Sequence, residues 1–182
     1  MSFLIESERL YLREPRESDA AGMQVLTRDP LMMRYINKGE PMPDAWIAEA
    51  RERQLGNLAE FGFCMGSVIR REDEALIGLG GIQPMRGSGE FETGWWTRRE
   101  DWGKGYAKEM ALASLRYGFE VAGLDRIVAV AVPQNTASIA VMRHIGMRDG
   151  GLRNARELEP RYADMDVAYW YVERADWACD RG

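Results

Sequence analysis

The residues with the clearest chemical meaning are two glycines around a lysine, Gly103-Lys104-Gly105, directly before a helical pattern that begins near Tyr106. The first backbone N–H groups of a helix have no partner within it, and glycine lets a ligand come close to the chain. The partial positive charge of a helix N-terminus also favours an anion. The turn therefore predicts a site for an anionic group such as a phosphate.

Spacing separates this turn from two common phosphate-binding motifs. The dinucleotide fingerprint G-x-G-x-x-G fails here because its last position is Lys108, and the cluster Gly78-Leu79-Gly80 fails in the same way at Gln83. A P-loop requires Ser or Thr after Gly-Lys, but here Gly105 follows the lysine. A nucleotide-binding module is therefore only a weak alternative.

Residues for other kinds of chemistry are scarce. The chain has one histidine, His144, and two cysteines, Cys64 and Cys179, that lie far apart in the sequence. No cluster has the spacing of a zinc site, and a disulfide framework is excluded. A serine or cysteine nucleophile with a histidine base would depend on His144, which has no nucleophile motif beside it. We therefore expect no metal and no nucleophilic triad.

The 182 residues are expected to form one domain, 1–182, long enough to bury about 70% of the unfolded surface. A content of 46% hydrophobic and 29% charged residues is typical of a soluble globular protein. No apolar run reaches the roughly 18 residues of a membrane span. The acidic start lacks signal-peptide features, so a cytoplasmic protein without a membrane partner is expected. The net charge of -5, without a basic tract, argues against nucleic acid as a partner.

Periodicity indicates an α+β fold. A strand at 9–13 precedes helical segments at 18–26, 29–35 and 45–60, the last capped by Asp44. Strand patterns follow at 61–70, 75–83 and 90–97. A long helix to residue 121, an apolar strand at 126–132, a helix at 135–144 and strands at 148–158 and 165–173 complete the order. We expect a mostly antiparallel mixed sheet of about seven strands, flanked by helices, with one strand, helix, strand crossover.

Several blocks, taken in this order, resemble GNAT family N-acetyltransferases of the RimJ/RimL type. The blocks are Leu10-Tyr11-Leu12-Arg13 with Asp19, Glu92-Thr93-Gly94-Trp95, Trp102-Gly103-Lys104-Gly105-Tyr106-Ala107, residues 126–132, Pro133-Gln134-Asn135-Thr136-Ala137-Ser138, His144-Ile145-Gly146-Met147 and Asp166-Val167-Ala168-Tyr169. They span nearly the whole chain, and together they are far more specific than a Gly-x-Gly pair. The resemblance implies the GNAT (acyl-CoA N-acyltransferase) fold, with acetyl-CoA as co-substrate.

The resemblance also assigns residues to acetyl-CoA. They are Trp95, Trp96, Thr97, Trp102, Gly103, Lys104, Gly105, Tyr106, Ala107, Asn135 and Ser138. The glycine loop would hold the pyrophosphate on backbone N–H groups, with added charge from Lys104 and Arg99. The strand would pair with the pantetheine arm, and an N–H near Trp96 would face the developing oxyanion. The first position of the family's loop pattern is the acidic Glu100 here, which weakens a side-chain contact but no backbone contact.

In this family the amine attacks the thioester directly, without an acyl-enzyme. A lysine-like amine must first lose a proton, which costs roughly 4.6 kcal/mol at pH 7, so a base or a water relay is needed. Glu92 is the first candidate for the base, with Glu157 and Glu159 as rivals. Many relatives place a tyrosine where this chain has Met142, which leaves Ser138 or a water to protonate the leaving thiolate.

These residues predict an acetyl-CoA-dependent N-acetyltransferase that acts on a primary amine. The candidate acceptors are a protein N-terminal α-amine, as the RimJ/RimL resemblance suggests, a small amine, an amino acid or an aminoglycoside. The mild overall acidity fits a cationic acceptor. An alternative of another class is a non-catalytic acyl-CoA-binding regulatory module, which the missing tyrosine keeps open. A homodimer also stays open.

Overall fold

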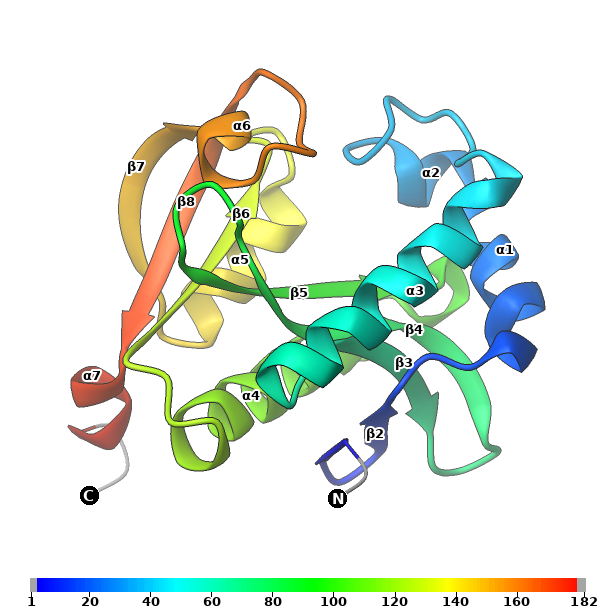
Figure 1. Cartoon of the computed structure of the whole chain (residues 1–182), viewed down its shortest axis with the longest axis horizontal. Coiled ribbons are helices and arrows are strands. Elements are labelled where there is room, and N and C mark those ends of the chain that lie inside the picture. The colour runs from blue at the N-terminus through cyan, green and yellow to red at the C-terminus, as the bar shows by residue number, and fades with distance from the viewer. Residues whose placement is uncertain (1–2, 180–182) are drawn as a thin grey trace.

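Eight strands form one sheet in residues 3–179, the part of the chain that the computed structural model describes. Their order across the sheet is β1-β2-β3-β4-β5-β6-β8-β7, and every neighbouring pair is antiparallel except β5 and β6 (Figure 1). The strands are β1 (Leu4–Glu6), β2 (Leu10–Arg13), β3 (Met65–Arg70), β4 (Ala75–Pro84), β5 (Phe91–Thr97), β6 (Arg126–Ala131), β7 (Arg148–Asn154) and β8 (Asp166–Glu173). The predicted mostly antiparallel sheet with one crossover is confirmed.

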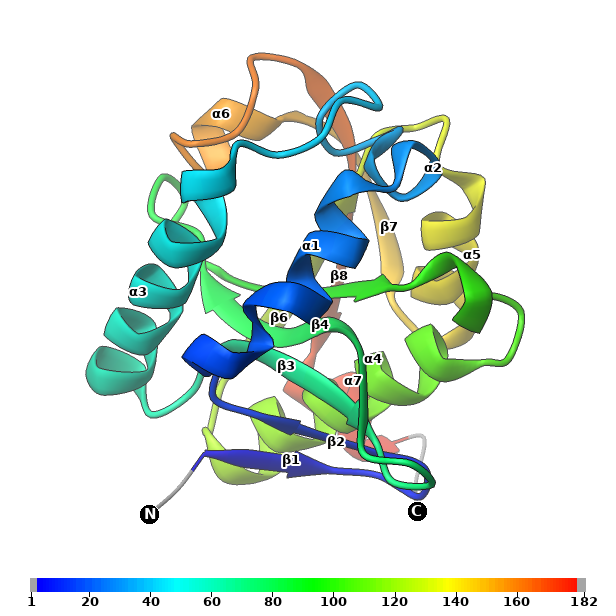
Figure 2. The same ribbon diagram turned by 90° about the vertical axis from the view of Figure 1, so that its right-hand side faces the viewer.

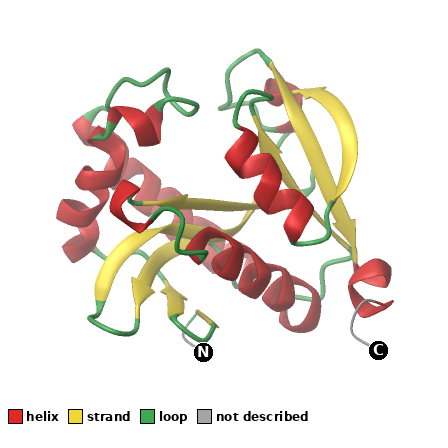
Figure 3. Ribbon diagram, turned by 180° about the vertical axis from the view of Figure 1, so that it is seen from behind, coloured by secondary structure: helices red, strands yellow, loops and turns green. Residues whose placement is uncertain are grey.

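Helices lie on both faces of this sheet, as Figures 1 and 3 show for α3 and α4. One group is α1 (Ala20–Arg28), α2 (Pro30–Met33) and α3 (Asp44–Phe61), preceded by the 3-10 turn η1 (Glu17–Asp19). The crossover from β5 to β6 contains η2 (Arg99–Asp101), α4 (Tyr106–Arg116) and the π-helical segment η3 (Tyr117–Val121). The later helices are α5 (Thr136–His144), α6 (Ala155–Leu158) and α7 (Arg174–Cys179). Within residues 3–179, none of these helices has the length and apolar character needed to cross a membrane.

Two predicted boundaries are wrong for local reasons. Helix α3 continues to Phe61, so the strand predicted from residue 61 begins only at Met65. Gly62 then adopts φ of 80°, and its N–H bonds the oxygen of Leu58, which ends the helix. The strand predicted over 148–158 ends at Asn154, whose side chain accepts a hydrogen bond from the N–H of Arg156 and so starts α6.

Two short elements, β1 and α7, are additional to the prediction. Strand β1 has three residues and α7 has six, so neither is long enough to show a reliable period. Strand β1 raises the number of strands from about seven to eight, and it pairs with β2 at the edge of the sheet.

Strand β6 is covered on both faces, as its apolar run predicts. Ile127 and Ala129 belong to the main core with residues of α4 such as Met110 and Leu115. Val128 faces a second, smaller cluster. That cluster contains Met85, Val128, Ala155, Leu158, Val167 and Tyr169. The second cluster joins α6 to the sheet and so holds the segment that follows α6.

Strands β5 and β6 diverge almost where they meet. Their register contains a single described pair, Glu92 with Val128, whereas β5 pairs with β4 over seven residues and β6 with β8 over six. Beyond that pair, β5 and β6 run apart in the middle of the sheet (Figure 1). Strand β5 therefore has an open edge along the residues that follow Glu92.

Candidate active site

The predicted anion-binding turn lies at the start of α4. Gly103 has φ of 73° and Gly105 has φ of 81°, values that side chains other than glycine rarely adopt. The bond from the N–H of Glu109 to the oxygen of Gly105, 3.0 Å long, closes the first turn of α4. The N–H groups of the three preceding residues, 106–108, therefore have no acceptor within the helix. The exposed turn is suited to an anion.

Arg9, in the link between β1 and β2, holds this turn. Its guanidinium donates to the oxygen of Lys104 (3.0 Å) and to Oε2 of Glu109 (2.7 Å) and lies over the ring of Tyr106. Its backbone N–H donates to Oε1 of Glu109, which also accepts from the hydroxyl of Ser7. The turn is therefore tied to the edge of the sheet as well as to its own helix.

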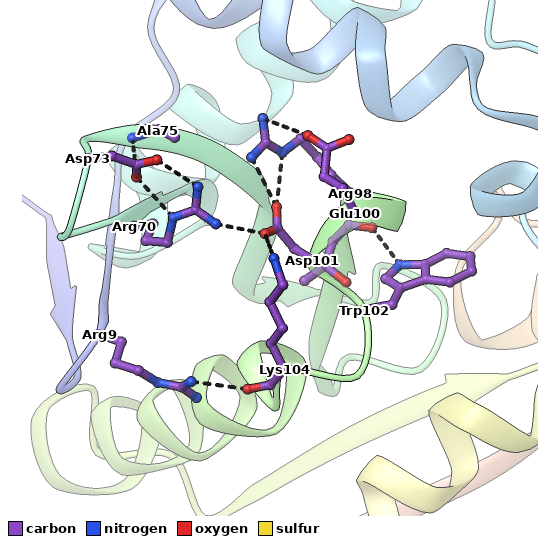
Figure 4. A network of polar contacts seen from close by, with 10 residues as sticks. Arg9, Arg70, Asp73, Ala75, Arg98, Glu100, Asp101, Trp102 and Lys104 are labelled. Carbon is purple, nitrogen blue, oxygen red and sulfur yellow. Dashed lines mark hydrogen bonds and ion pairs between the residues drawn. The ribbon is translucent and has the colours of Figure 1, made fainter.

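A buried carboxylate, Asp101, anchors the segment before the turn (Figure 4). It accepts hydrogen bonds from Arg70 (2.7 Å), Arg98 (3.0 Å) and Lys104 (3.1 Å). Burial raises the pKa of Asp101, but the hydrogen bonds from Lys104 and Arg98 outweigh it, so the pKa is lowered. Lys104, one of the two cations predicted for the phosphates, thus shares its charge with Asp101. The other, Arg99, lies 3.4 Å from a carboxylate oxygen of Asp29.

Trp102 connects the turn to the end of β5. Its indole N–H donates to the oxygen of Thr97 (2.9 Å), and 45% of the residue remains exposed. The side chain of Tyr106 is buried, so only its backbone can face a ligand in the turn. The predicted residues 102–107 are thus brought together at one end of β5, with their backbone exposed between two anchored segments.

The register decides which backbone groups line the open edge of β5. The N–H of Arg98 donates to the oxygen of Ile77, and this position fixes the alternation of the ladder between β4 and β5. Trp96 therefore directs its backbone groups to β4, while Trp95 and Thr97 direct theirs to the opposite edge. An N–H near Trp96 is expected to face the developing oxyanion. Because the N–H of Trp96 itself points to β4, that expectation refers to a neighbouring residue of β5.

Asn135 and Ser138 lie at the start of α5. The side-chain oxygen of Asn135 accepts a hydrogen bond from the N–H of Ser138 (3.2 Å), so Asn135 caps the helix. Ser138 is half-buried. Met142, at the position where many relatives have a tyrosine, is 1% exposed and belongs to the main core. Position 142 therefore offers no proton donor.

A cavity of about 960 Å³ opens between α1, the loop after α2, α3 and α6, over β4, β5 and β6. Figure 2 shows α1 and α3 side by side over the sheet, and Figure 1 shows α6 across from α3. Trp46 of α3 and Trp96 of β5 stack in the lining, with ring centroids 5.7 Å apart and planes at 9°. Of the residues predicted to bind the cofactor, Trp96 is in this lining, whereas Asn135 and Ser138 are not.

Glu92 lies in the cavity wall at the point where β5 and β6 diverge. It is 6% exposed and accepts hydrogen bonds from the hydroxyl of Tyr162 (2.6 Å) and from Nε2 of Gln83 (3.1 Å). Burial raises the pKa of Glu92, and the bonds from Tyr162 and Gln83 offset only part of that effect. A carboxylate with neutral donors and a raised pKa is a stronger base than an exposed glutamate.

Buried amides fix the orientation of this site. Oε1 of Gln83 accepts from Nε2 of Gln54 (2.9 Å), so the amide nitrogen of Gln83 faces Glu92. Oε1 of Gln54 in turn accepts from the N–H of Met65 at the start of β3 (3.0 Å). The carboxylate of Glu92 is therefore held by a chain of side chains from α3, β4 and the segment after α6.

The two rival bases lie elsewhere. Glu159 is buried but accepts hydrogen bonds from Arg161 (2.9 Å) and from the N–H of Arg86 (3.1 Å). Burial raises the pKa of Glu159, yet these bonds outweigh it and lower the pKa. Glu157 is exposed on α6. Neither glutamate lines the cavity, so the geometry favours Glu92.

Tyr162 and Gln83 are candidate site residues that sequence reasoning missed. Burial is the main cause that raises the pKa of Tyr162 well above its usual value, so its hydroxyl stays a proton donor. Neither residue belongs to a recognisable motif, and only their packing against Glu92 reveals them. Within residues 3–179, no group of three or more His, Cys, Asp or Glu side chains is placed to hold a metal ion.

Comparisons with known proteins agree with this geometry. Residues 9–148 match the family model described as an acetyltransferase (GNAT) domain. An uncharacterised N-acetyltransferase of Bacillus subtilis, YnaD, is 34% identical over 174 residues, which cover 95% of this chain and 98% of the relative. A GNAT family acetyltransferase of Bacillus anthracis has a similar solved structure, with a TM-score of 0.78, 29% identity, and 95% and 99% of the two chains covered.

A solved structure of RimL, a ribosomal L7/L12 α-N-protein acetyltransferase in complex with coenzyme A, also matches. The TM-score is 0.69, and the match covers 94% of this chain and 98% of RimL. At 19% identity this likeness shows a shared fold alone. The GNAT fold predicted from the sequence is confirmed by these matches.

Proposed function

Because the chain belongs to the GNAT acetyltransferase family, we propose that it transfers the acetyl group of acetyl-CoA directly to a primary amine. The observation that carries this proposal is the position of Glu92. Its carboxylate is buried in a cavity wall, held by neutral donors, at the point where β5 and β6 diverge. A base at this place can meet an amine that enters from the cavity.

The residues present fit acetyl-CoA. The turn at Gly103 and Gly105 presents the free N–H groups of α4 to a phosphate. The open edge of β5 offers backbone groups of Trp95 and Thr97 to an extended amide chain. When bound, acetyl-CoA supplies an activated thioester, so the protein needs no nucleophile of its own.

Glu92 acts in this proposal as the general base. An amine that enters as its ammonium form loses a proton to the carboxylate, whose raised pKa brings it closer to the pKa of the amine. Tyr162 and Gln83 position the carboxylate, and Tyr162 keeps its own proton because its pKa is raised. Ser138 or a water molecule protonates the leaving thiolate, because position 142 holds a buried methionine.

Two measurements, made one after the other, test the proposal. Acetyl-CoA at saturation should raise the midpoint of thermal unfolding, because a ligand that binds only the native state stabilises it. Thiol release from acetyl-CoA should then be screened against peptides with free N-termini, polyamines, amino acids and aminoglycosides. No thermal shift would contradict acetyl-CoA as the co-substrate. A thermal shift without turnover on a broad panel would instead favour the regulatory, non-catalytic alternative.

A further inference from the structure

The lining of the cavity does not share the acidity of the whole chain. Five arginines and four acids line it. These are Arg16, Arg51, Arg53, Arg156 and Arg161, with Glu17, Asp19, Asp44 and Glu92. Two of the acids are paired with arginines outside the lining, Asp19 with Arg13 and Asp44 with Arg28. The unpaired charge that faces the cavity is therefore mainly positive, although the chain carries a net charge of -5.

The guanidinium groups of four of the five lining arginines have no carboxylate oxygen within 4.0 Å among residues 3–179. The exception is Arg161, whose Nε lies 2.9 Å from Oε1 of the buried Glu159. A cationic acceptor such as a polyamine would have to enter against this charge. The expectation of a cationic acceptor, which rests on the overall charge, therefore does not extend to the cavity itself.

Arg53 is the most informative of these arginines. It is half-buried in the middle of α3, and its Nε is fully covered yet has no hydrogen-bond partner among the described residues. Burial lowers the pKa of Arg53, repulsion from Arg161 lowers it further, and Glu159 and Glu49 act only at longer range. An arginine stays charged in proteins, so this half-buried guanidinium is a cation with a covered Nε and no carboxylate partner among residues 3–179.

The arginine pair and the candidate base belong to one continuous region. Tyr162, which donates to Glu92, directly follows Arg161 in the segment after α6. The charge of Arg161 acts on Tyr162 as well as on Arg53. An amine beside Glu92 and an anionic group beside Arg53 can therefore belong to one small molecule.

We propose that the acceptor is a small amine that also carries a carboxylate, such as an α-amino acid, and that Arg53 and Arg161 bind this carboxylate. The inference rests on the proposed acetyltransferase function and names its substrate class. Guanidinium and carboxylate groups form paired, charge-assisted hydrogen bonds, which would satisfy the buried Nε of Arg53. Polyamines and aminoglycosides carry no such anion, and a protein N-terminus has a peptide bond where an amino acid has its carboxylate.

The test compares amino acids with their carboxamides, which keep the amine and remove the carboxylate charge. Thiol release from acetyl-CoA is measured with each of the twenty α-amino acids and the matching amides. For the best amino acid, kcat/KM should exceed that of its amide by at least about 30-fold, since a partly buried charge pair is lost. Equal use of the amide, or better use of spermidine, would overturn the proposal.

Substitution of Arg53 gives an independent readout. Arg53→Met keeps an unbranched apolar stem and should lower kcat/KM for the amino acid by about 30-fold, mainly through KM, and should lower kcat/KM for the amide far less. Arg53→Lys should restore part of the loss. Arg148→Met, an exposed arginine of β7, is the matched control and should change neither rate. An equal loss on acid and amide would overturn the role of Arg53.

The outcomes also separate this inference from the function it rests on. If Arg53→Met weakens the thermal stabilisation by acetyl-CoA, Arg53 serves the co-substrate and the inference fails while the transferase proposal stands. If no amine of any class supports thiol release, the proposed function itself fails. Thermal unfolding of each variant without ligand shows whether the fold is intact, and the charged Arg53→Lys variant replaces Arg53→Met if the latter is unfolded.

Discussion

The turn before α4 and the cavity over β5 are built from different kinds of groups. The turn offers backbone N–H groups from residues that follow one another in the chain, and Arg9 and Asp101 fix it from both sides. The cavity offers side chains from α3, β5 and the segment after α6, which are far apart in the sequence. A backbone site suits a co-substrate shared by a whole family, whereas a side-chain site can change its acceptor by single substitutions.

Their buried carboxylates show the same contrast. Asp101 is surrounded by Arg70, Arg98 and Lys104, so its pKa is lowered and it stays ionised. Glu92 has only the neutral donors Tyr162 and Gln83, so burial keeps its pKa raised. A carboxylate among cations is a structural anchor, while one among neutral groups can exchange a proton.

The largest expected effect is on the chemistry at Glu92. Glu92→Gln keeps the shape and the hydrogen-bonding capacity of the side chain but removes the base, so kcat should fall by about 10² to 10⁴. The stabilisation by acetyl-CoA should remain, because the turn is unaffected. Glu157→Gln, on the exposed face of α6, is the matched control and should keep the wild-type rate. An unchanged rate and pH profile in Glu92→Gln would remove Glu92 as the base.

The folding stability of Glu92→Gln tests whether a lower rate comes from the loss of the base or from damage to the structure. Because the folded pKa of Glu92 is raised, the native state binds its proton more readily than the unfolded state, and stability falls as the pH rises above about 4.5. The variant lacks this penalty. Its unfolding midpoint at pH 8 should therefore equal or exceed that of the wild type, and a lower midpoint would point to a structural role.

The next effect is the loss of co-substrate binding at the turn. Gly105→Glu places a side chain at φ of 81° and a negative charge among the free N–H groups of α4. Acetyl-CoA at 100 times its Kd should stabilise the wild type by about 2.7 kcal/mol and the variant not at all. Gly56→Glu, a change of the same kind at an open position of α3, should keep the full shift. A shift retained in Gly105→Glu would place the phosphates elsewhere.

The free energy of unfolding should distinguish Asp19 from Asp101, two aspartates that hold arginine side chains in place. Asp19 accepts a bidentate contact from Arg13 and a bond from Ser67, so Asp19→Asn leaves a partly buried cation and should cost about 3 kcal/mol of unfolding free energy. Asp101→Asn should cost less, because Arg70 keeps Asp73 and Arg98 keeps Glu100. Urea unfolding at pH 7 measures both values, and the reverse order would contradict this account.

The same two carboxylates should determine part of the loss of folding stability at low pH. Burial raises the pKa of Asp19 and of Asp101, but hydrogen bonds outweigh it and the folded pKa of each is lowered. Their contribution is therefore present above about pH 4, the unfolded value, and is lost as the pH falls through the folded pKa. Each Asn variant should show a shallower loss of stability in acid than the wild type.

The smallest expected effect concerns Tyr162. Its hydrogen bond lowers the pKa of Glu92, so Tyr162→Phe should raise that pKa further and move the acidic limb of the kcat/KM profile to higher pH. The rate near neutral pH should fall about fivefold, as expected for one net hydrogen bond of about 1 kcal/mol. Tyr171→Phe, on β8 outside the cavity lining, should leave the limb in place. An unmoved limb in Tyr162→Phe would separate Tyr162 from Glu92.

Most of the fold could be predicted from local patterns. The period of the strands and the cap at Asn135 depend on residues close in sequence, so they are visible without the tertiary structure. The end of α3 at Phe61 and the short elements β1 and α7 were harder to predict, because the choice of helix or strand there depends on packing. Of the candidate site, the glycine turn and Glu92 could be predicted, the latter only through its place in a family motif.

The sequence by itself determined the turn at Gly103 and Gly105, because the unpaired N–H groups of a helix start and the backbone freedom of glycine depend only on neighbouring residues. Only the tertiary structure decided that Glu92 rather than Glu159 faces the cavity, and that Arg53 lies there with no carboxylate partner in the described part of the chain. A site built from backbone depends on neighbours in the chain. A site built from side chains depends on which distant segments pack together and on which charges remain unpaired when they do.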